Sequence, residues 1–408
     1  STDLTRSQFE MSAWGEPAAS SVTRIKKDRI AGTTALKVMF AVVVVASVAA
    51  FTIPIAVILG KKPISESIAA CTINPCQNGG ICSVNSTTSP YYQCSCALGT
   101  SGVNCSTSVG NLTWNTTGVV VITITDVPFQ NGIYIKNGII YTGNSGGGVS
   151  GQIIKTTSSL NSTVYPYTTS VVVTGLASPT WPIIDSQGVY MYIPDTDVNT
   201  VYRYFLGSST TTNYSVLMHN SAAQSSVDMF IAFDSTESNI YVSDDRNNRV
   251  LMYPVNATNA TIGLLVAGSN SSGNAATQLS GNQGIYYDPA SNYLYIANLN
   301  GHSVSRWTPG ASNGTFIIGI PGSSGSALTK LNQPFSVTMD KYSNLYVADY
   351  GNHRVMGYCA GTYTNNLSSG ISLLGNLGYG PQNIAFDSSM NLYLNDWDNN
   401  LVYKFAKL

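Results

Sequence analysis

Charged residues are scarce in this chain. Only 10% of the 408 residues are Asp, Glu, Lys or Arg, and the formal net charge is −1, whereas about 25% is usual in globular proteins. No basic patch occurs in residues 118–408, which argues against nucleic acid as a partner. Such a weakly charged surface is poorly protected from association, so another solubilising group is expected.

Common catalytic signatures are also missing. The sequence has no GxSxG elbow, no HExxH motif and no glycine-rich phosphate loop. It has only three histidines, and a catalytic zinc ion needs about three protein ligands, usually His, around one centre. We therefore predict no catalytic residue, no metal site and no cofactor.

The chain instead contains a repeated sequence motif. It consists of an apolar pair, an aspartate, a short gap, Leu-Tyr and a second Asp or Asn. The second Asx recurs at steps of 51, 49, 54, 51 and 47 residues, as Asn144, Asp195, Asp244, Asn298, Asp349 and Asp396. A fixed period of this size is typical of a solenoid, an array or a propeller.

Each repeat alternates with period two, is rich in Tyr, Val, Ile and Thr, and is punctuated by turn residues, which predicts short antiparallel strands. The fifth repeat contains four candidate strands, Phe335–Met339, Asn344–Ala348, Arg354–Tyr358 and Ile371–Leu374. Six repeats of four strands predict an all-β fold, a six-bladed propeller.

The last repeat ends with its third strand, Val402–Ala406, so its fourth strand is missing. Residues 118–125, read as GVVVITIT, resemble the outer strands of other repeats. We therefore expect Val119–Thr125 to complete the sixth blade and to remove the open edge of a linear array.

The segment Leu345–Tyr358, LYVADYGNHRVMGY, resembles the NHL repeat, which is named after an Asn-His-Leu run. Here the run is Asn352, His353 and Arg354, and the other copies depart from it. The resemblance implies an NHL-type propeller over residues 118–408. Propellers of this family include a zinc lyase, and others of similar shape are calcium lactonases, so a propeller enzyme with an axial metal site is one alternative function.

The histidines do not favour that alternative. His353 belongs to the repeat signature and His302 occupies the matching place in the fourth repeat, so both are expected on blade turns. His219 is expected in or beside an outer strand. The repeated Asx residues are interpreted as turn caps, although the pairs Asp195/Asp197, Asp244/Asp245 and Asp396/Asp398 also offer oxygen ligands for calcium.

The N-terminal part reads as a tail (residues 1–35) and an apolar segment (residues 36–60). Val38–Gly60 holds no charge over 23 residues, which is long enough for a helix to cross a bilayer. Five basic residues precede it and two follow it, which predicts a cytoplasmic N-terminus. We expect a single-pass type II plasma-membrane protein whose C-terminal domains are extracellular.

Residues 71–105 lie between linkers at 61–70 and 106–117 and contain six cysteines. Spacing alone allows fifteen pairings. The run from Cys76 to Cys105 resembles an EGF-like module, which implies the bridges Cys71–Cys82, Cys76–Cys94 and Cys96–Cys105. The stretch SESIAA before Cys71 lacks the residues of calcium-binding members, so no calcium is predicted there. The seventh cysteine, Cys359, is expected to be a buried thiol on a strand, with an intermolecular bridge as the alternative.

N-linked glycans at the glycosylation sequons would make this weakly charged surface soluble. N-linked glycans are expected at Asn85, Asn111, Asn115, Asn161, Asn213, Asn256, Asn259, Asn270, Asn313 and Asn366. The sequon at Asn104 is set aside because its middle residue is Cys105. Each blade has a sequon near the connection between its third and fourth strands, which predicts a ring of glycans around one face and leaves the other face freer for contacts.

Residues at the start of each inner strand are expected to line an axial channel, and the candidates are Trp181, Asp228, Gln283, Phe335 and Asn383. The favoured interpretation is a non-enzymatic, membrane-anchored glycoprotein whose propeller binds extracellular protein or glycan partners in adhesion or scaffolding. The alternative is a structural subunit of an extracellular filament or coat, a homopolymer assembled through its apolar helix.

Overall fold

The computed structural model describes residues 81–84, 92–95, 100–101, 107–108, 113–123, 130–146, 149–219, 229–269, 271–396 and 398–408. The tail, the apolar segment 36–60 with its membrane-spanning prediction, and the linker 61–70 lie outside the described residues. Within the described ranges, no helix is long and apolar enough to span a bilayer.

Two short sheets come from the cysteine-rich region and the linker after it. β1 (Ile81–Val84) pairs with β2 (Tyr92–Ser95), and β3 (Thr100–Ser101) pairs with β4 (Thr107–Ser108), both antiparallel. The side chains of all six cysteines lie outside what the structure describes, so the three EGF-type bridges stay predictions.

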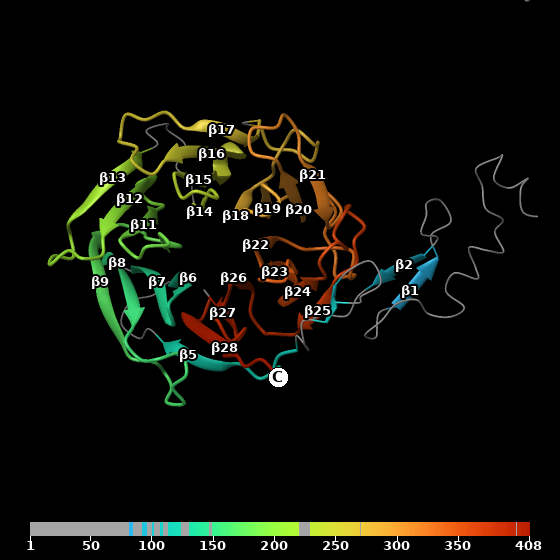
Figure 1. Cartoon of the computed structure of the whole chain (residues 1–408), viewed down its shortest axis with the longest axis horizontal. Helices are drawn as coiled ribbons and strands as arrows, with labels where there is room; N and C mark the ends of the chain where they lie inside the picture. Colours follow the sequence, from blue (N-terminus) through green and yellow to red (C-terminus); the bar gives the residue numbers. More distant parts are fainter. Residues whose placement is uncertain are drawn as a thin grey trace, which may run out of the picture. The chain divides into compact units, whose positions relative to one another are not determined.

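Six four-stranded antiparallel sheets form a ring of blades (Figure 1). Blade 1 contains β6 (Gln130–Lys136), β7 (Ile139–Gly146), β8 (Val149–Thr156) and β9 (Thr169–Leu176). Blade 2 contains β10 (Ile183–Ile184), β11 (Tyr190–Asp195), β12 (Thr200–Phe205) and β13 (Tyr214–His219). Blade 3 contains β14 (Ile231–Phe233), β15 (Asn239–Asp244), β16 (Arg249–Pro254) and β17 (Leu264–Gly268).

Blade 4 contains β18 (Asn282–Asp288), β19 (Tyr293–Asn298), β20 (Ser303–Trp307) and β21 (Thr315–Ile318). Blade 5 contains β22 (Pro334–Met339), β23 (Leu345–Asp349), β24 (Arg354–Tyr358) and β25 (Ile371–Leu374). Blade 6 contains β26 (Pro381–Phe386), β27 (Leu392–Asp396), β28 (Leu401–Phe405) and, out of sequence order, β5 (Val119–Thr123). The helices described are two short 3-10 turns, η1 (Asp245–Asn247) and η2 (Tyr350–Asn352).

The predicted six-bladed all-β fold is therefore confirmed. The second strand of each blade is buried on both faces because it is sandwiched between neighbouring sheets, as every residue of Leu345–Asp349 shows. Outer strands instead expose part of their length, and Tyr214–His219 buries only Leu217 and Met218. The core thus lies between successive blades: Val355 and Leu374 of blade 5 share one apolar cluster with Leu392 and Leu394 of blade 6.

Ring closure uses the strand that the sequence predicted. β5 pairs antiparallel with β28 and becomes the fourth strand of blade 6, with Ile122 opposite Val402. The first and last residues of the propeller adjoin there, since the Leu408 N–H donates to the Thr113 carbonyl (2.9 Å) and the Asn115 N–H to the Ala406 carbonyl (2.8 Å).

The Trp114 side chain packs between blades 5 and 6, next to the strand that closes the ring. The indole is 5% exposed, packs edge-on against Tyr346 and tilted against Phe386, and donates from Nε1 to the Met390 carbonyl (2.8 Å). Tyr346 belongs to blade 5 and Phe386 to blade 6, so Trp114 ties two blades together. The packed structure therefore begins before Gly118, the start predicted from the sequence, because the large apolar surface of Trp114 is buried between the blades.

Lys404 makes a second tie, between blade 6 and blade 1. Its ammonium, on β28, donates to the Leu160 carbonyl (2.6 Å) in the connection between β8 and β9 and lies 3.5 Å from the Tyr167 hydroxyl. Burial lowers the pKa of Lys404. A long cationic side chain thus bridges the junction at which the first and last blades meet.

Replacing Trp114 should weaken the whole propeller. We expect Trp114→Ala to lower the free energy of unfolding by about 3–5 kcal/mol, the usual cost of removing a buried Trp, measured by chemical denaturation of the full chain. Phe205→Ala is the control, because Phe205 is 45% exposed on an outer part of blade 2 and should cost about 1 kcal/mol or less. Equal stability of the two variants would show that Trp114 does not secure the closure.

Candidate functional site

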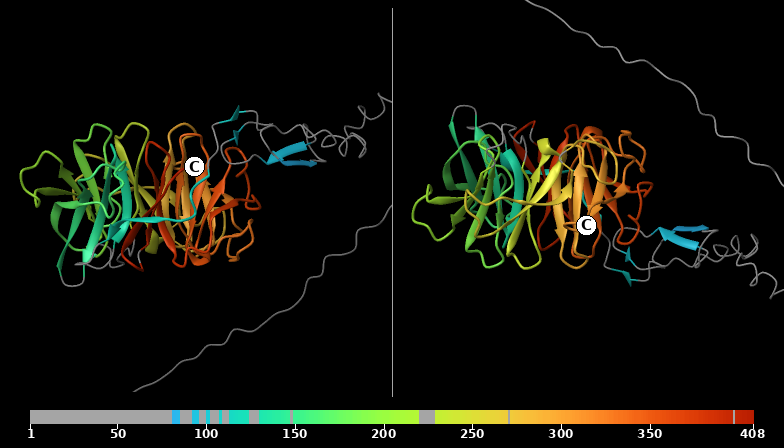
Figure 2. Two further views of the ribbon diagram at one scale, coloured as in Figure 1. Left: turned by 90° about the horizontal axis from the view of Figure 1, so that it is seen from below. Right: turned by 90° about the horizontal axis from the view of Figure 1, so that it is seen from above.

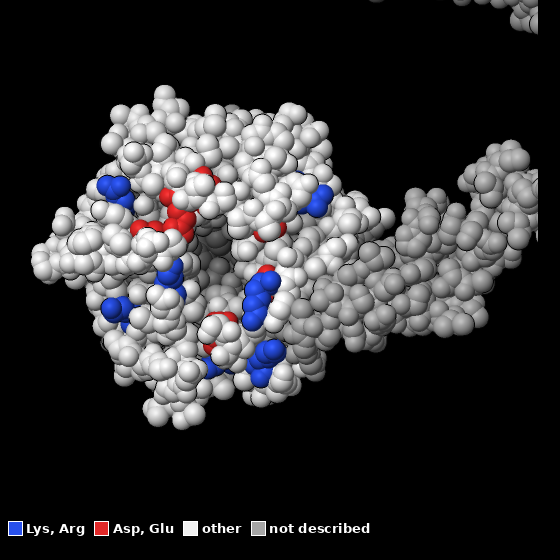
Figure 3. All heavy atoms as spheres, in the orientation of Figure 1, with Lys and Arg blue, Asp and Glu red and all other residues white. Residues whose placement is uncertain are grey.

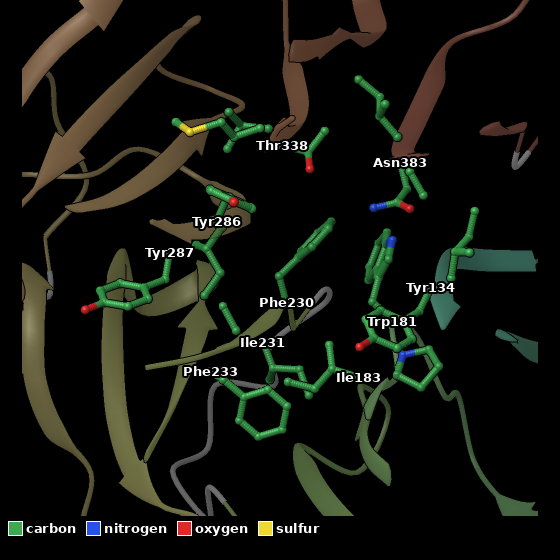
Figure 4. A pocket seen from close by; sticks show the side chains of 18 of the residues that line it. Tyr134, Trp181, Ile183, Phe230, Ile231, Phe233, Tyr286, Tyr287, Thr338 and Asn383 are labelled. Atoms are coloured by element: carbon green, nitrogen blue, oxygen red, sulfur yellow. The ribbon is translucent and has the colours of Figure 1, made fainter. Parts of the chain in front are cut away.

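The inner strands of all six blades surround a cavity of about 520 Å³ on the propeller axis. Figure 3 shows the central hollow, and Figure 4 shows the side chains around it. Its walls are mainly aromatic and aliphatic, and the aromatic members are Tyr134, Trp181, Phe230, Phe233, Tyr286, Tyr287 and Phe386. A concave, largely apolar cavity with few polar groups is typical of a small-molecule site.

Three buried rings form the floor of this axial pocket. Trp181 stacks on Phe230 with ring centroids 3.7 Å apart, and Phe335 lies 5.9 Å from Trp181 and 6.0 Å from Phe230. Trp181 precedes the inner strand of blade 2, whereas Phe335 lies on that of blade 5. Blades 2 and 5 are opposite each other in a ring of six, so a contact between these rings must cross the axis.

Gly132 makes room for Trp181. It lies on β6 with φ of 81°, and a Cβ built on it would collide with the Nε1 atom of the Trp181 indole. Only glycine combines this left-handed backbone with so close an approach. The floor thus depends on a glycine in blade 1 as well as on the rings of blades 2, 3 and 5.

Two unsatisfied donors face the deep part of the pocket. Trp181 is 5% exposed, yet its Nε1–H has no hydrogen-bond partner. Asn383 accepts a bond from the Ile133 N–H at Oδ1 (3.2 Å), while its Nδ2 has no partner among the described residues. The buried indole N–H is costly without a partner, and the Asn383 side chain beside it is half-buried, so this corner is suited to an acceptor supplied by a ligand.

The mouth of the pocket carries its charges. Asp234 and Glu237, from the turn between β14 and β15, line the cavity there, and acidic side chains lie around the hollow in Figure 3. Burial raises the pKa of both Tyr134 and Tyr286 to about 12. Both phenols therefore stay neutral at physiological pH.

The five predicted channel residues have different positions. Trp181 and Asn383 line the pocket. Phe335 belongs to the floor. Gln283 is buried outside the pocket lining, and its Nε2 donates to Asp245 Oδ2 (3.3 Å). Asp228 lies outside the described residues. The start of the inner strand thus supplies the floor, and the residues further along supply the walls.

Most of the wall residues were not predicted from the sequence, among them Tyr134, Phe230, Phe233, Tyr286, Tyr287 and Phe386. A signal was present, because several of these residues stand one to three positions before the first aspartate of the repeat, as in GIYYD and IAFD. Those positions recur at the same height in successive blades, and so they converge on one level of the axis.

Several of the repeated Asx residues are buried caps, as predicted, whereas the Asn144 Oδ1 is buried without a hydrogen-bond partner among the described residues. Asp195 accepts bonds from the backbone N–H groups of Ala177 (2.8 Å) and Ser178 (2.7 Å), and Asp349 accepts one from Asn332 (2.7 Å). Asp349 also pairs with the Arg354 guanidinium (2.7 Å). Among the described residues, no three His, Cys, Asp or Glu side chains lie close enough to hold a metal ion.

The histidines lie where they were expected, whereas Cys359 is buried as predicted but directly follows β24 instead of lying on the strand. His302 and His353 have φ of 52° and 53° in the turns before β20 and β24. His219 ends the outer strand β13, and its Nδ1 lies 2.9 Å from the Thr200 hydroxyl. The Cys359 thiol is buried, and burial raises its pKa to about 11.

The sequons of the propeller share the face on which the pocket opens. In an antiparallel meander, the turn between strands 1 and 2 and the connection between strands 3 and 4 lie on the same side, and Figure 2 shows the turns gathered on two faces. All of the sequon asparagines at these connections are exposed except Asn366, which is half-buried: Asn115, Asn161, Asn213, Asn256, Asn259, Asn313 and Asn366. Asn85, Asn111 and Asn270 lie outside the described side chains.

No protein-family model and no curated protein sequence matches this chain. Solved structures do resemble it. A Bacteroides thetaiotaomicron structural genomics protein of unknown function is 17% identical, with 72% of each chain covered and a TM-score of 0.50. The calcium structure of a Trichoderma reesei carbohydrate-active enzyme of family AA12 is 11% identical, covering 72% of this chain and 96% of that one, with a TM-score of 0.52. At these identities the likeness shows the fold alone.

The contact between Gly132 and Trp181 can be tested with a matched glycine. Gly138 also has a left-handed φ, 74°, but a Cβ there would meet nothing within 4 Å. Gly138→Ala should therefore cost only the backbone penalty, about 1–2 kcal/mol. Gly132→Ala should cost clearly more in chemical denaturation, because its methyl group collides with the indole.

A double-mutant cycle isolates the collision. In a Trp181→Ala background, the extra cost of Gly132→Ala over Gly138→Ala should disappear. If that extra cost persists without the indole, then Gly132 is required for a reason other than the floor of the pocket.

Proposed function

We propose that this chain is a non-enzymatic binding module of NHL type, part of a membrane-anchored extracellular glycoprotein, and that the propeller holds its ligand in the axial pocket. The observation that carries the proposal is the pocket itself. It has aromatic walls from five of the six blades, a floor of stacked rings and one buried donor, the Trp181 Nε1–H, without a partner. Such a cavity offers apolar contact and directional hydrogen bonding, and these are the requirements for binding.

The size of the pocket limits the ligand. A volume of about 520 Å³ lies within the range of about 300–1,000 Å³ that is usual for small-molecule sites. The floor prevents a chain from threading through the axis, because Trp181, Phe230 and Phe335 meet there. The ligand is therefore a small molecule, or the tip of a larger one, that enters from one face.

The sequon ring supports the same limit. The exposed sequons at the connections between third and fourth strands surround the face on which the pocket opens. Glycans there would hinder a broad protein surface from lying flat over the mouth, while a small ligand would still pass. Large adhesion or scaffolding partners would then use the opposite face of the ring.

A fragment screen with ligand-observed NMR tests the proposal on the purified full chain. Thr338 lines the pocket and points into it in Figure 4. Thr338→Phe should therefore fill the cavity and weaken the binding of hits at least tenfold. Thr169→Phe is the matched control on the exposed start of β9 and should bind like the wild type. The absence of any hit that Thr338→Phe removes would refute a ligand site on the axis.

Glycopeptide mass spectrometry of material from eukaryotic cells tests the ring of sugars. We expect the sequon of every blade to be occupied, with lower occupancy at the half-buried Asn366 than at the exposed Asn161 and Asn313. Unmodified asparagines at most of these sites would remove the glycan argument and leave the pocket unaffected.

A further inference from the structure

The charged side chains that line the pocket have one sign, although basic side chains also lie beside the hollow in Figure 3. Asp234 and Glu237 are the charged side chains among the described residues that line it, and neither has a cationic partner in the lining. At the rim, the Lys136 ammonium donates to the backbone carbonyls of Asp185 (3.0 Å) and Ser186 (3.4 Å). The lining of the pocket itself is therefore acidic.

The structure keeps Asp234 ionised. Its carboxylate accepts bonds from Asn239 Nδ2 (2.7 Å), the Ser238 N–H (2.9 Å) and the Thr236 N–H (3.3 Å). Burial alone would raise the pKa of Asp234, but these bonds outweigh it and hold the pKa below its usual value. The carboxylate therefore carries its charge at any physiological pH.

Glu237 is held toward the adjacent blade. It has a left-handed φ of 53°, and its Oε2 accepts a bond from the Ser186 N–H of blade 2 (2.8 Å). Its Oε1 accepts no bond from the described residues. One carboxylate oxygen at the mouth is thus left for a ligand.

Below these carboxylates the walls are aromatic. Seven rings line a cavity of about 520 Å³, and the faces of Trp, Tyr and Phe attract cations by about 0.5–2 kcal/mol each, most strongly where water is excluded. Toward the floor, the buried Trp181 Nε1–H has no acceptor, and the half-buried Asn383 offers an Nδ2 group that has no partner among the described residues. The polarity of the pocket therefore runs from donors at the floor to carboxylates at the mouth.

We infer that the axial pocket selects a small organic cation with an aromatic or apolar body, whose charged end lies between Asp234 and Glu237 and whose other end offers a carbonyl or hydroxyl acceptor to Trp181 and Asn383. This inference rests on the proposed binding function and names its ligand class. An anion is disfavoured by the carboxylates, and a neutral molecule leaves them without a cationic partner in the pocket.

A matched set of probes tests the charge. 4-(2-Aminoethyl)benzamide carries the cation, the aromatic body and the acceptor; 4-propylbenzamide replaces the amine with a methyl group; 3-(4-carbamoylphenyl)propanoate carries an anion instead. On the full chain at low salt, the cation should bind about tenfold more tightly than the neutral probe, as one well-placed charge contact of about 1.4 kcal/mol implies. The anion should bind most weakly, and added salt should reduce the advantage of the cation.

Variants assign the charge to its residue. Glu237→Gln should remove most of the cation's advantage and leave the binding of 4-propylbenzamide unchanged. Asp197→Asn is the control, because Asp197 is an exposed acid on the opposite face, in the turn between β11 and β12. Asn383→Ala should weaken all three probes alike, by roughly fivefold for one lost hydrogen bond.

The outcomes separate the two proposals. If the neutral or anionic probe binds as tightly as the cation, and Thr338→Phe still abolishes binding, the ligand class is wrong and the pocket remains a binding site. If Glu237→Gln and Asp197→Asn have the same effect, the charge contact is refuted. If none of the probes binds the wild-type chain, the inference fails, and the fragment screen alone decides the binding function.

Discussion

Closure of the sixth sheet by an N-terminal strand is the constraint on which the rest of the structure depends. β5 gives blade 6 its fourth strand, Trp114 wedges between blades 5 and 6, and Lys404 ties blade 6 to blade 1. A ring closed in this way has a fixed circumference, and so its inner strands stand at a fixed distance from the axis. The axial pocket is a product of that distance, because no single blade contains it.

The volume of the side chains at the centre of the ring determines whether the axis forms a pocket or an open channel. Six inner strands leave a gap, and the rings of Trp181, Phe230 and Phe335 fill its lower part. Because Gly132 has no side chain, the Trp181 indole can lie across the gap. What remains is a pocket with one opening instead of a continuous channel. The same rings that stabilise the core therefore also give the ligand an apolar platform with one polar atom, the Trp181 Nε1–H.

Much of the fold could be predicted from the sequence because propeller blades repeat their chemistry. The recurring Asx marks the end of each second strand, since a buried carboxylate or amide is required there to cap the loop that enters the blade, as Asp195 and Asp349 do. Trp114 escaped prediction because a single aromatic residue between two sequons forms no pattern. Its role depends on a junction between the two ends of the propeller, which are far apart in the sequence.

The pocket was harder to predict for a different reason. Trp181 and Asn383 were expected at the axis and do line the cavity, whereas Phe335 lies in the floor. Strand position alone does not fix the depth at which a cavity begins, because that depth depends on the volume of side chains contributed by opposite blades. The contact between Phe335 and Trp181 joins residues on opposite sides of the ring, and no local periodicity encodes it.

The adjacency of Thr113 and Leu408 has a mechanical consequence. A pull that reaches the ring through the residues before Thr113 would first act on the Trp114 wedge and then on β5, which would be peeled from β28 one pair at a time rather than sheared along its length. The other five sheets would carry little of that load. Under tension the ring would therefore open at blade 6. The force needed would depend on the strength of the packing and hydrogen bonding of the Trp114 indole between blades 5 and 6.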